Sequence, residues 1–383
     1  MIELASRDKD VGAMDAFLEE LAVHPVRDEE LGGALGRYLD IKARERGIPL
    51  HGTFELTPLC NLNCKMCYVH LGREQIDMKR MLSFDQWKAL IDQAIHAGMF
   101  DVSLTGGECL THPKFDGIYL YLQESGFRPA ILTNGLLLTK DRIAFFKKHP
   151  PKGIQVTLYG SNDDEYEAVT GVRCFDIVMR NMGFLERSRI PFSVAITPNR
   201  YLCDRGESLI KLVHHRGWSY SINTALFTPR QETGRSETVQ DLENDEYIRL
   251  HLLRRSLAGR QARLNHDCEL PVPPAQGRAV KGLQCSAGNS GFFIGWDGKM
   301  LPCGSFDGIE SYPLKMGFLQ AWKEIHAACQ EYPLPCECIE CPYNHLCPAC
   351  VMVHRQDSLP GHASPRVCDR AKKLVQNGLG NLV

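Results

Sequence analysis

Six short apolar segments, separated by stretches with helical patterning, constrain the fold of this chain more than any other feature. They span residues 51–57, 100–106, 129–135, 153–160, 192–198 and 220–226. Strands that alternate with helices pair into a parallel sheet, and right-handed crossovers curl such a sheet toward a barrel. We therefore predict an α/β fold with a complete or partial barrel.

The loops that follow the first two predicted strands are the expected location of the functional site. In parallel barrels, chemistry is carried by the carboxyl ends of the strands and by the loops after them.

A helix is expected between these two loops. Ser83 and Gln86 form a capping box at its start, and Gly98 fits the position after its end.

The rest of the chain predicts three further parts. Apolar positions in residues 1–50 recur at three- and four-residue spacing, which indicates helix. After the barrel we expect a helix that ends at Gly259 and then a linker, with a polar loop at 230–237 within reach of a substrate. The expected boundaries are 1–50 for the N-terminal helical segment, 51–225 for the barrel, 226–283 for the helix and linker, and 284–383 for a cysteine-rich region.

The amino-acid composition of the cysteine-rich region differs from that of the barrel. Turn residues dominate it, and Asp297-Gly298 is expected to form the turn of a hairpin. Because long apolar periodicity is scarce there, we expect metal ions or cross-links to hold this region together.

Composition excludes several classes of function. The net charge of −2 gives no basic field for nucleic acid or an anionic membrane, and no run of 18 apolar residues could span a bilayer. The charged start lacks the apolar core of a secretion signal, so we expect a cytoplasmic protein. Sixteen cysteines in a reducing compartment are more typical of metal ligation than of disulfides.

Cys60, Cys64 and Cys67 lie within eight residues, directly after the first predicted strand. They supply three thiolates and no obvious fourth, whereas a structural zinc site uses four ligands. A four-iron cluster also normally has four cysteines. Three thiolates would leave one iron open, which is how a metal site accepts a substrate or cofactor.

A glycine pair followed by a glutamate ends the second predicted strand. Gly106 and Gly107 would allow the backbone to approach a ligand closely. Glu108 is expected to point into the same mouth as the three cysteines, where its carboxylate can hold an ammonium group.

With these two motifs after successive strands, residues 51–225 resemble the radical SAM superfamily. The resemblance implies a partial (βα)6 barrel in which Cys60, Cys64 and Cys67 hold a [4Fe–4S] cluster and S-adenosylmethionine chelates the open iron. It also implies reductive cleavage to a 5′-deoxyadenosyl radical, which abstracts hydrogen from a substrate. An external low-potential electron donor of the flavodoxin or ferredoxin type would supply the electron.

The same resemblance implies which residues contact S-adenosylmethionine. Gly106, Gly107 and Glu108 match the motif that contacts its amino group, and Thr157 matches a position that contacts its carboxylate. The residue before the third cysteine is usually aromatic and packs near adenine; here it is Met66, with Tyr68 two places on. The family often has proline after the glutamate, where this chain has Cys109, which we expect to be a buried, inert thiol.

A second cysteine pattern fills the C-terminal region. Two zinc knuckles are one interpretation, but zinc ribbons separate their paired cysteines by about 15–20 residues, and five separate Cys341 from Cys347 here. The region resembles the SPASM domain, which carries auxiliary clusters in radical SAM enzymes that modify peptides and proteins. The resemblance implies two further [4Fe–4S] clusters: an outer set of Cys338, Cys341, Cys347 and Cys368, and an inner set of Cys285, Cys303 and Cys350.

The pattern departs from SPASM domains in two places. Two residues, rather than three, separate Cys347 from Cys350, and no eighth cysteine lies between Cys285 and Cys303. The inner cluster would then have an open iron or take a ligand such as Cys336 or Cys268. Cys174, Cys203 and Cys329 are isolated and are expected to be packed thiols.

The resemblance favours a peptide or protein as the substrate, modified by a cross-link, a dehydrogenation or a similar maturation. Sulfatase-maturating relatives carry aspartate after the second SPASM cysteine, whereas Gly304 stands here. Two alternatives remain: an enzyme of the same architecture that acts on a small molecule, and a non-catalytic iron–sulfur or zinc protein. The catalytic base is not identified; His112 is expected to be a loop residue near the mouth.

Overall fold

The computed structural model describes residues 28–69, 71, 75–223, 226–229, 241–258, 281–306, 308–338, 341–343, 347, 350–359 and 361–379. The chain divides into two compact units, Met1–Gly47 and Ile48–Val383. In the first, helix α3 (Asp28–Arg46) agrees with the predicted helical segment over its length. The rest of that prediction, residues 1–27, lies outside the described residues, as do the polar loop 230–237 and most of the linker, including Cys268.

The second unit is built on one sheet with the strand order β6-β5-β4-β3-β2-β1-β7-β8. All six predicted strands are confirmed, and each pairs in parallel with the next. The strands are β1 (His51–Glu55), β2 (Asp101–Thr105), β3 (Ala130–Thr133), β4 (Gly153–Leu158), β5 (Phe192–Ile196), β6 (Tyr220–Ile222), β7 (Gly291–Ile294) and β8 (Met300–Leu301).

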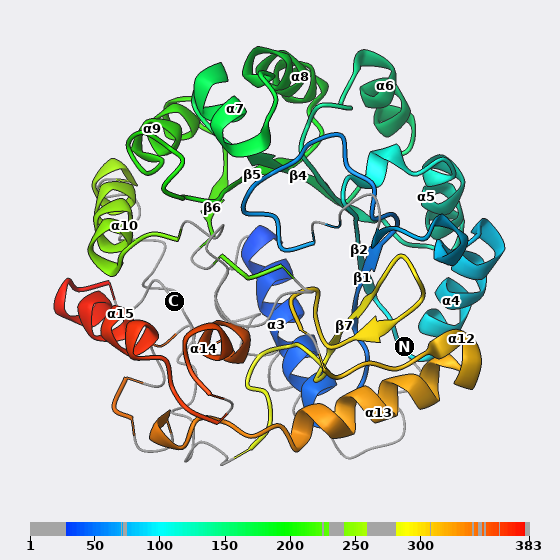
Figure 1. Ribbon diagram of the computed structural model, residues 1–383. Coiled ribbons are helices and arrows are strands. Elements are labelled where there is room, and N and C mark those ends of the chain that lie inside the picture. The colour runs from blue at the N-terminus through cyan, green and yellow to red at the C-terminus, as the bar shows by residue number, and fades with distance from the viewer. Residues whose placement is uncertain are drawn as a thin grey trace. The chain divides into compact units, whose positions relative to one another are not determined.

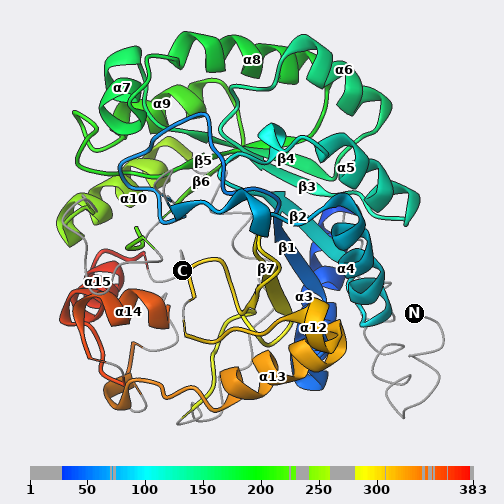
Figure 2. The same ribbon diagram turned by 45° about the vertical axis from the view of Figure 1, so that its right-hand side comes forward.

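Helices follow the parallel strands and lie along the outside of the curved sheet, as Figures 1 and 2 show. They are α4 (Phe84–His96), α5 (Phe115–Glu124), α6 (Lys140–Lys148), α7 (Asp163–Thr170), α8 (Phe175–Ser188), α9 (Glu207–His215) and α10 (Asn244–Ala258). The predicted capping box is confirmed, because Ser83 and Gln86 each accept a hydrogen bond from the other's backbone N–H. The helix predicted to end at Gly259 is α10.

Strand β7 extends the barrel sheet on the far side of β1, although it comes from the cysteine-rich region. It pairs with β1 in parallel, with Thr53 opposite Phe293. The predicted hairpin is confirmed: β7 and β8 are antiparallel, and Gly298 takes the left-handed conformation (φ 81°) that the turn needs. The sheet therefore ties the cysteine-rich region to the first strand of the barrel.

The expectation that the cysteine-rich region lacks long apolar periodicity was wrong. Helix α13 (Phe318–Gln330) buries Phe318, Trp322 and Ile325 on one face, and α15 (Pro365–Gln376) buries an apolar face of its own. Its shorter helices are α12 (Pro313–Met316), η4 (Cys336–Cys338) and α14 (Val351–Asp357). This region therefore has a hydrophobic core in addition to its cysteines.

An aromatic contact fixes the cysteine-rich region against the barrel, and a charged contact fixes it to the segment before α10. The ring of Phe292 on β7 lies 5.0 Å from that of Phe318 and 6.2 Å from that of Phe54 on β1. Asp241, which precedes α10, accepts a hydrogen bond from Arg366 on α15 at 2.5 Å. No helix within the described residues is long and apolar enough to cross a membrane.

Candidate functional site

The cysteine loop, residues 57–69, follows β1 at the carboxyl edge of the sheet. Its backbone is fastened to the end of α7, because the N–H of Asn63 donates to Thr170 at 3.1 Å and that of Lys65 to Val169 at 2.9 Å. Cys60 is exposed, and Cys64 and Cys67 are partly buried. The barrel thus holds all three predicted ligands in one fixed loop.

The glycine pair after β2 packs against this loop. The N–H of Gly107 donates to the carbonyl of Thr57 at 2.7 Å, and that of Glu108 to Leu59 at 2.8 Å. A Cβ added to Gly107 would lie 2.5 Å from the Leu59 oxygen, and one on Gly106 would lie 2.8 Å from the Thr57 oxygen. A side chain at either position would therefore collide with the cysteine loop, and the approach of a ligand to the two glycines stays a prediction.

Glu108 is buried and bonded within the chain. Its carboxylate accepts hydrogen bonds from the Thr133 hydroxyl at 2.9 Å and from the N–H groups of Asn134 at 2.8 Å and Leu110 at 3.1 Å. Burial raises the pKa of Glu108, and these hydrogen bonds oppose the rise. The structure thus uses the Glu108 oxygens to join the ends of β2 and β3, and the predicted role of binding an ammonium group gains no support from its contacts.

Asn134 continues this connection to the first cysteine. Its side-chain amide donates to the Asn61 oxygen at 2.7 Å and lies 3.8 Å from the Cys60 sulfur. Sequence reasoning missed Thr133 and Asn134, although both stand at the end of a predicted strand, where barrel sites are found.

Thr157 lies on β4. Its neighbours Val156 and Leu158 are buried in the core, and Thr157 alternates with them and is partly exposed. The following residue, Tyr159, hydrogen-bonds to Cys64. The end of the fourth strand therefore lies beside the cysteine loop, and a contact of Thr157 with the carboxylate of S-adenosylmethionine stays a prediction.

Met66 and Tyr68 both face the segment after β6. Met66 is 8% exposed and packs with Val169, Leu202 and Leu226. The ring of Tyr68 meets that of Phe227 edge to face at 5.9 Å. A contact of either side chain with adenine stays a prediction.

The three thiols of the cysteine loop are spread more widely than the ligands of one ion. Tetrahedral zinc would hold its sulfurs about 3.8 Å apart. Within the described residues, one group of three or more His, Cys, Asp or Glu side chains has all its ligand atoms within 4.8 Å of one another. The three cysteines of this loop are not part of that group. Burial, and then repulsion from the Cys67 and Cys60 thiolates, raises the pKa of Cys64. The positive charge of several iron ions would offset this repulsion between the thiolates. A cluster of several metal ions therefore fits these three thiols better than a single zinc ion.

The inner set lines one cavity within the cysteine-rich region. Cys285, Cys303 and Cys350 all face it, together with Cys338 and His354. Burial, and then repulsion from Cys350 and Cys285, raises the pKa of Cys303 to about 11. The fold thus brings together three cysteines that are distant in sequence, and their chemistry fits an iron–sulfur cluster.

The outer set lines a second, adjoining cavity. Cys338, Cys341, Cys347 and Cys368 all face it, and His354 lines this cavity as well as the first. Four thiols around one cavity fit a fully ligated cluster. The two groups of cysteines expected from the SPASM pattern therefore gather at two neighbouring cavities.

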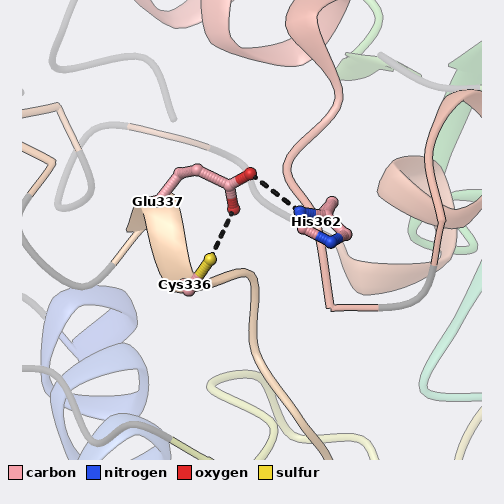
Figure 3. A group of neighbouring side chains, drawn as sticks. All are labelled: Cys336, Glu337 and His362. Carbon is pink, nitrogen blue, oxygen red and sulfur yellow. Dashed lines mark hydrogen bonds and ion pairs between the residues drawn. The ribbon is translucent and has the colours of Figure 1, made fainter.

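The remaining described cysteines have other surroundings. Cys109 is fully buried and its thiol lies 3.4 Å from the Leu132 carbonyl, as expected for an inert thiol. Cys174 and Cys329 are buried, as predicted, but Cys203 is exposed, so its prediction as a packed thiol was wrong. Cys336 is exposed and does not line the inner cavity; Figure 3 shows it beside Glu337 and His362.

Comparison with known proteins agrees with this geometry. Residues 54–215 match the model of the Radical SAM superfamily. The chain is 32% identical over 130 residues to the antilisterial bacteriocin subtilosin biosynthesis protein AlbA of Bacillus subtilis (strain 168). The aligned part is 34% of this chain and 28% of AlbA.

Two further relatives match most of the chain at lower identity. The sporulation killing factor maturation protein SkfB of Bacillus subtilis (strain 168) is 23% identical over 87% of this chain and 78% of its own length. The AdoMet-dependent heme synthase of Methanosarcina barkeri is 23% identical over 78% of this chain and 89% of its own length.

Solved structures share the fold across both regions. SuiB of Streptococcus suis, bound to S-adenosylmethionine, superposes with a TM-score of 0.65 at 15% identity, over 96% of this chain and 89% of SuiB. The enzyme anSMEcpe, bound to AdoMet and the Cp18Cys peptide, superposes with a TM-score of 0.66 at 15% identity, over 87% of this chain and 98% of its own. The partial barrel and its cysteine loop lie within residues 54–215, the part of the chain that matches the Radical SAM superfamily model.

Proposed function

We propose that this chain is a radical SAM enzyme that modifies a peptide or protein. The observation that carries the proposal is the cysteine loop after β1, whose backbone carbonyls at Thr57 and Leu59 accept hydrogen bonds from Gly107 and Glu108 of the next loop. Support for a peptide substrate comes from relatives named for bacteriocin biosynthesis and killing-factor maturation, and from the likeness to SuiB and to peptide-bound anSMEcpe.

Cys60, Cys64 and Cys67 would hold a [4Fe–4S] cluster with one open iron. When bound, this cluster supplies the electron that cleaves S-adenosylmethionine and so gives the enzyme its hydrogen-abstracting radical. Around it, Gly106, Gly107, Glu108, Thr157, Met66 and Tyr68 are the proposed S-adenosylmethionine-binding residues.

The structure suggests different roles for these binding residues. Glu108 acts indirectly, because its oxygens hold the backbone of Asn134 and the end of β3 in position. Thr157, which is partly exposed on β4, would donate its hydroxyl to the carboxylate of the cofactor. Met66 excludes water from the side of the cysteine loop that faces α7.

The inner and outer sets would hold two auxiliary [4Fe–4S] clusters. The adjoining cavities support this assignment, since all three cysteines of the inner set line one cavity and all four of the outer set line the other; Cys338 lines both. The inner set has three cysteines and would leave an iron open. Cys336 is not among the residues that line the inner cavity, which argues against it as the missing ligand. An external flavodoxin- or ferredoxin-type protein in a reducing, cytoplasmic compartment would supply electrons.

A small-molecule substrate is the second candidate. Its support is the likeness to the AdoMet-dependent heme synthase, which extends over 78% of this chain. The two candidates share the radical-generating site and differ in what enters it.

Incubation with precursor peptides separates the two candidates. The cluster-loaded, reduced enzyme is given S-adenosylmethionine and short peptides encoded beside its gene, and the products are weighed. A loss of two hydrogens indicates a cross-link or dehydrogenation, and solvent deuterium at unchanged nominal mass indicates epimerisation. If no such peptide changes while a small molecule is turned over, the peptide assignment is wrong.

A further inference from the structure

A cluster of three metal-ligating side chains lies outside the cysteine sets described above. Cys336 and Glu337 come from η4, and His362 comes from the turn between α14 and α15. Their ligand atoms all lie within 4.8 Å of one another. Figure 3 shows the Glu337 carboxylate between the other two side chains, with one oxygen toward the Cys336 sulfur and the other toward the His362 ring.

The backbone holds these side chains together. The N–H of Cys336 donates to the carbonyl of Gly361 at 3.3 Å, and the N–H of Ala363 donates to Glu337 at 3.3 Å. The sulfur of Cys336 lies 3.3 Å from one carboxylate oxygen, and Nδ1 of His362 lies 3.1 Å from the other. Two segments that are separate in sequence therefore meet with their donor atoms already converged.

The donor set suits zinc. A thiolate, an imidazole nitrogen and a carboxylate oxygen are the ligands that this ion prefers, and thiolate plus carboxylate balances its charge of +2. All three side chains are exposed, so an ion can enter from solvent and a water molecule can complete a tetrahedron.

We propose that Cys336, Glu337 and His362 form a zinc-type divalent cation site that links η4 to the turn before α15. Both segments lead into the outer set, since Cys338 ends η4 and Cys368 lies on α15. A bound ion would therefore hold together the two chain segments that lead to Cys338 and Cys368. The site does not depend on the proposed radical chemistry.

Zinc titration of the iron-loaded enzyme under anaerobic conditions tests the site. We expect about one zinc per chain, with one sulfur and otherwise nitrogen or oxygen neighbours in zinc K-edge absorption. Cys336→Ser and His362→Gln should each weaken zinc binding by at least about ten-fold, since even supporting residues of metal sites cost that much. Iron content should stay unchanged.

The exposed thiol of Cys203 provides the matched control, and Cys203→Ser should leave zinc binding unchanged. The proposal is overturned if Cys336→Ser binds zinc as the unmodified enzyme does. It is also overturned if the absorption spectrum shows two or more sulfurs, because zinc would then occupy one of the cysteine sets.

A different observation concerns His354, which lines both the inner and the outer cavity. It is 3% exposed and lies on α14, four residues after Cys350, the N-cap of that helix. The backbone N–H of Ser364 donates to its Nδ1 at 2.8 Å. A backbone N–H can only donate, so Nδ1 carries no proton, and the neutral ring must carry its proton on Nε2.

This tautomer decides what His354 can do toward a cluster. A ring protonated on Nε2 cannot ligate iron through that atom without becoming an imidazolate, but it can donate a hydrogen bond to sulfur. Hydrogen bonds to cluster or thiolate sulfur stabilise the reduced, more negative state and raise the reduction potential. The geometry assigns His354 as a hydrogen-bond donor in the wall between the two auxiliary-cluster cavities, an assignment that rests on the proposed function.

Redox titration followed by electron paramagnetic resonance tests this assignment. The measurement uses a background variant with Cys60, Cys64 and Cys67 replaced by alanine, so that only auxiliary clusters remain. His354→Phe should lower the potential of an auxiliary cluster, and His354→Gln, which keeps an N–H donor, should restore it in part. His251→Phe, at a buried histidine on α10, should change neither potential.

Two results would overturn the role of His354. One is a His354→Phe variant with full iron and unchanged potentials. The other, which needs no substitution, is a strong hyperfine coupling from ¹⁵N-labelled histidine, because it would show that His354 ligates iron. A background variant without iron would instead refute the auxiliary clusters, and with them this inference.

Discussion

The backbone N–H of Asn134 donates a hydrogen bond of 2.8 Å to the carboxylate of Glu108, across the ends of β3 and β2. The same Asn134 side chain lies 3.8 Å from the sulfur of Cys60. The glutamate of the Gly-Gly-Glu motif is therefore linked to the first cysteine through one residue that neither motif contains.

Glu108→Gln should destabilise the protein and loosen the cysteine loop. The glutamine amide would place N–H groups against the donors of Thr133 or Asn134, and a buried unsatisfied donor costs about 1–3 kcal/mol. We expect lower resistance to urea and less iron bound by the cysteine loop. Glu124→Gln, at an exposed position on α5, is the control and should change neither. Unchanged stability and iron content in Glu108→Gln would show that its bonds do not support the loop.

Gly107→Ala should disrupt the contact between the two loops. The added Cβ would lie 2.5 Å from the Leu59 carbonyl oxygen, so one loop must move. We expect incomplete iron loading of the cysteine loop, measured in a protein whose auxiliary cysteines are replaced. Gly153→Ala on β4 is a matched control, because its nearest neighbour would be 3.5 Å away. Equal iron loading in the two variants would contradict the role given to Gly107.

His112 should make stability depend on pH. Burial lowers the pKa of His112 to about 4 from its ordinary 6.5. Between these values the unfolded chain binds a proton that the folded chain does not, so stability falls as pH decreases from about 6.5 toward 4. The loss should be roughly 2–3 kcal/mol.

Urea unfolding at several pH values measures this effect. His112→Asn should flatten the curve between about pH 6.5 and 4, whereas His96→Asn, on an exposed part of α4, should not. A curve with the same slope in His112→Asn would mean that other groups cause the pH dependence.

Phe292→Ala should weaken the attachment of the cysteine-rich region to the barrel. The ring is 2% exposed and lies against Phe54, Phe318 and Trp322, so its removal should cost about 3–5 kcal/mol. Leu319→Ala, on the exposed side of α13, should stay within about 0.5 kcal/mol of the parent. If proteolysis and unfolding show equal stability in the two variants, β7 does not join the regions as described.

The sequence predicted the six barrel strands because each is a local apolar segment bounded by turn residues. It did not predict β7 beside β1, because that pairing joins His51 to Gly291 and leaves no local signal. The helices α13 and α15 do carry local apolar spacing, which was overlooked among the cysteines and turn residues of this region.

At the site, spacing located the motifs but not the direction of the side chains. The glycines were expected to allow a close approach to a ligand, and spacing did not reveal how closely they approach the Thr57 and Leu59 carbonyls of the cysteine loop. Glu108 stood at the expected strand end, but its partners Thr133 and Asn134 come from the next strand, so only the fold reveals them. The exposure of Cys203 likewise depends on tertiary packing.

Release of 5′-deoxyadenosine tests the central claim most directly. The iron-loaded, reduced protein is mixed with S-adenosylmethionine, and the product is quantified by mass spectrometry. We expect release by the parent and by Cys109→Ser, whose buried thiol lies next to Glu108, and none by Cys64→Ser. The absence of 5′-deoxyadenosine from fully loaded parent protein, or its undiminished release by Cys64→Ser, would contradict the assignment of the cysteine loop as the radical-generating site.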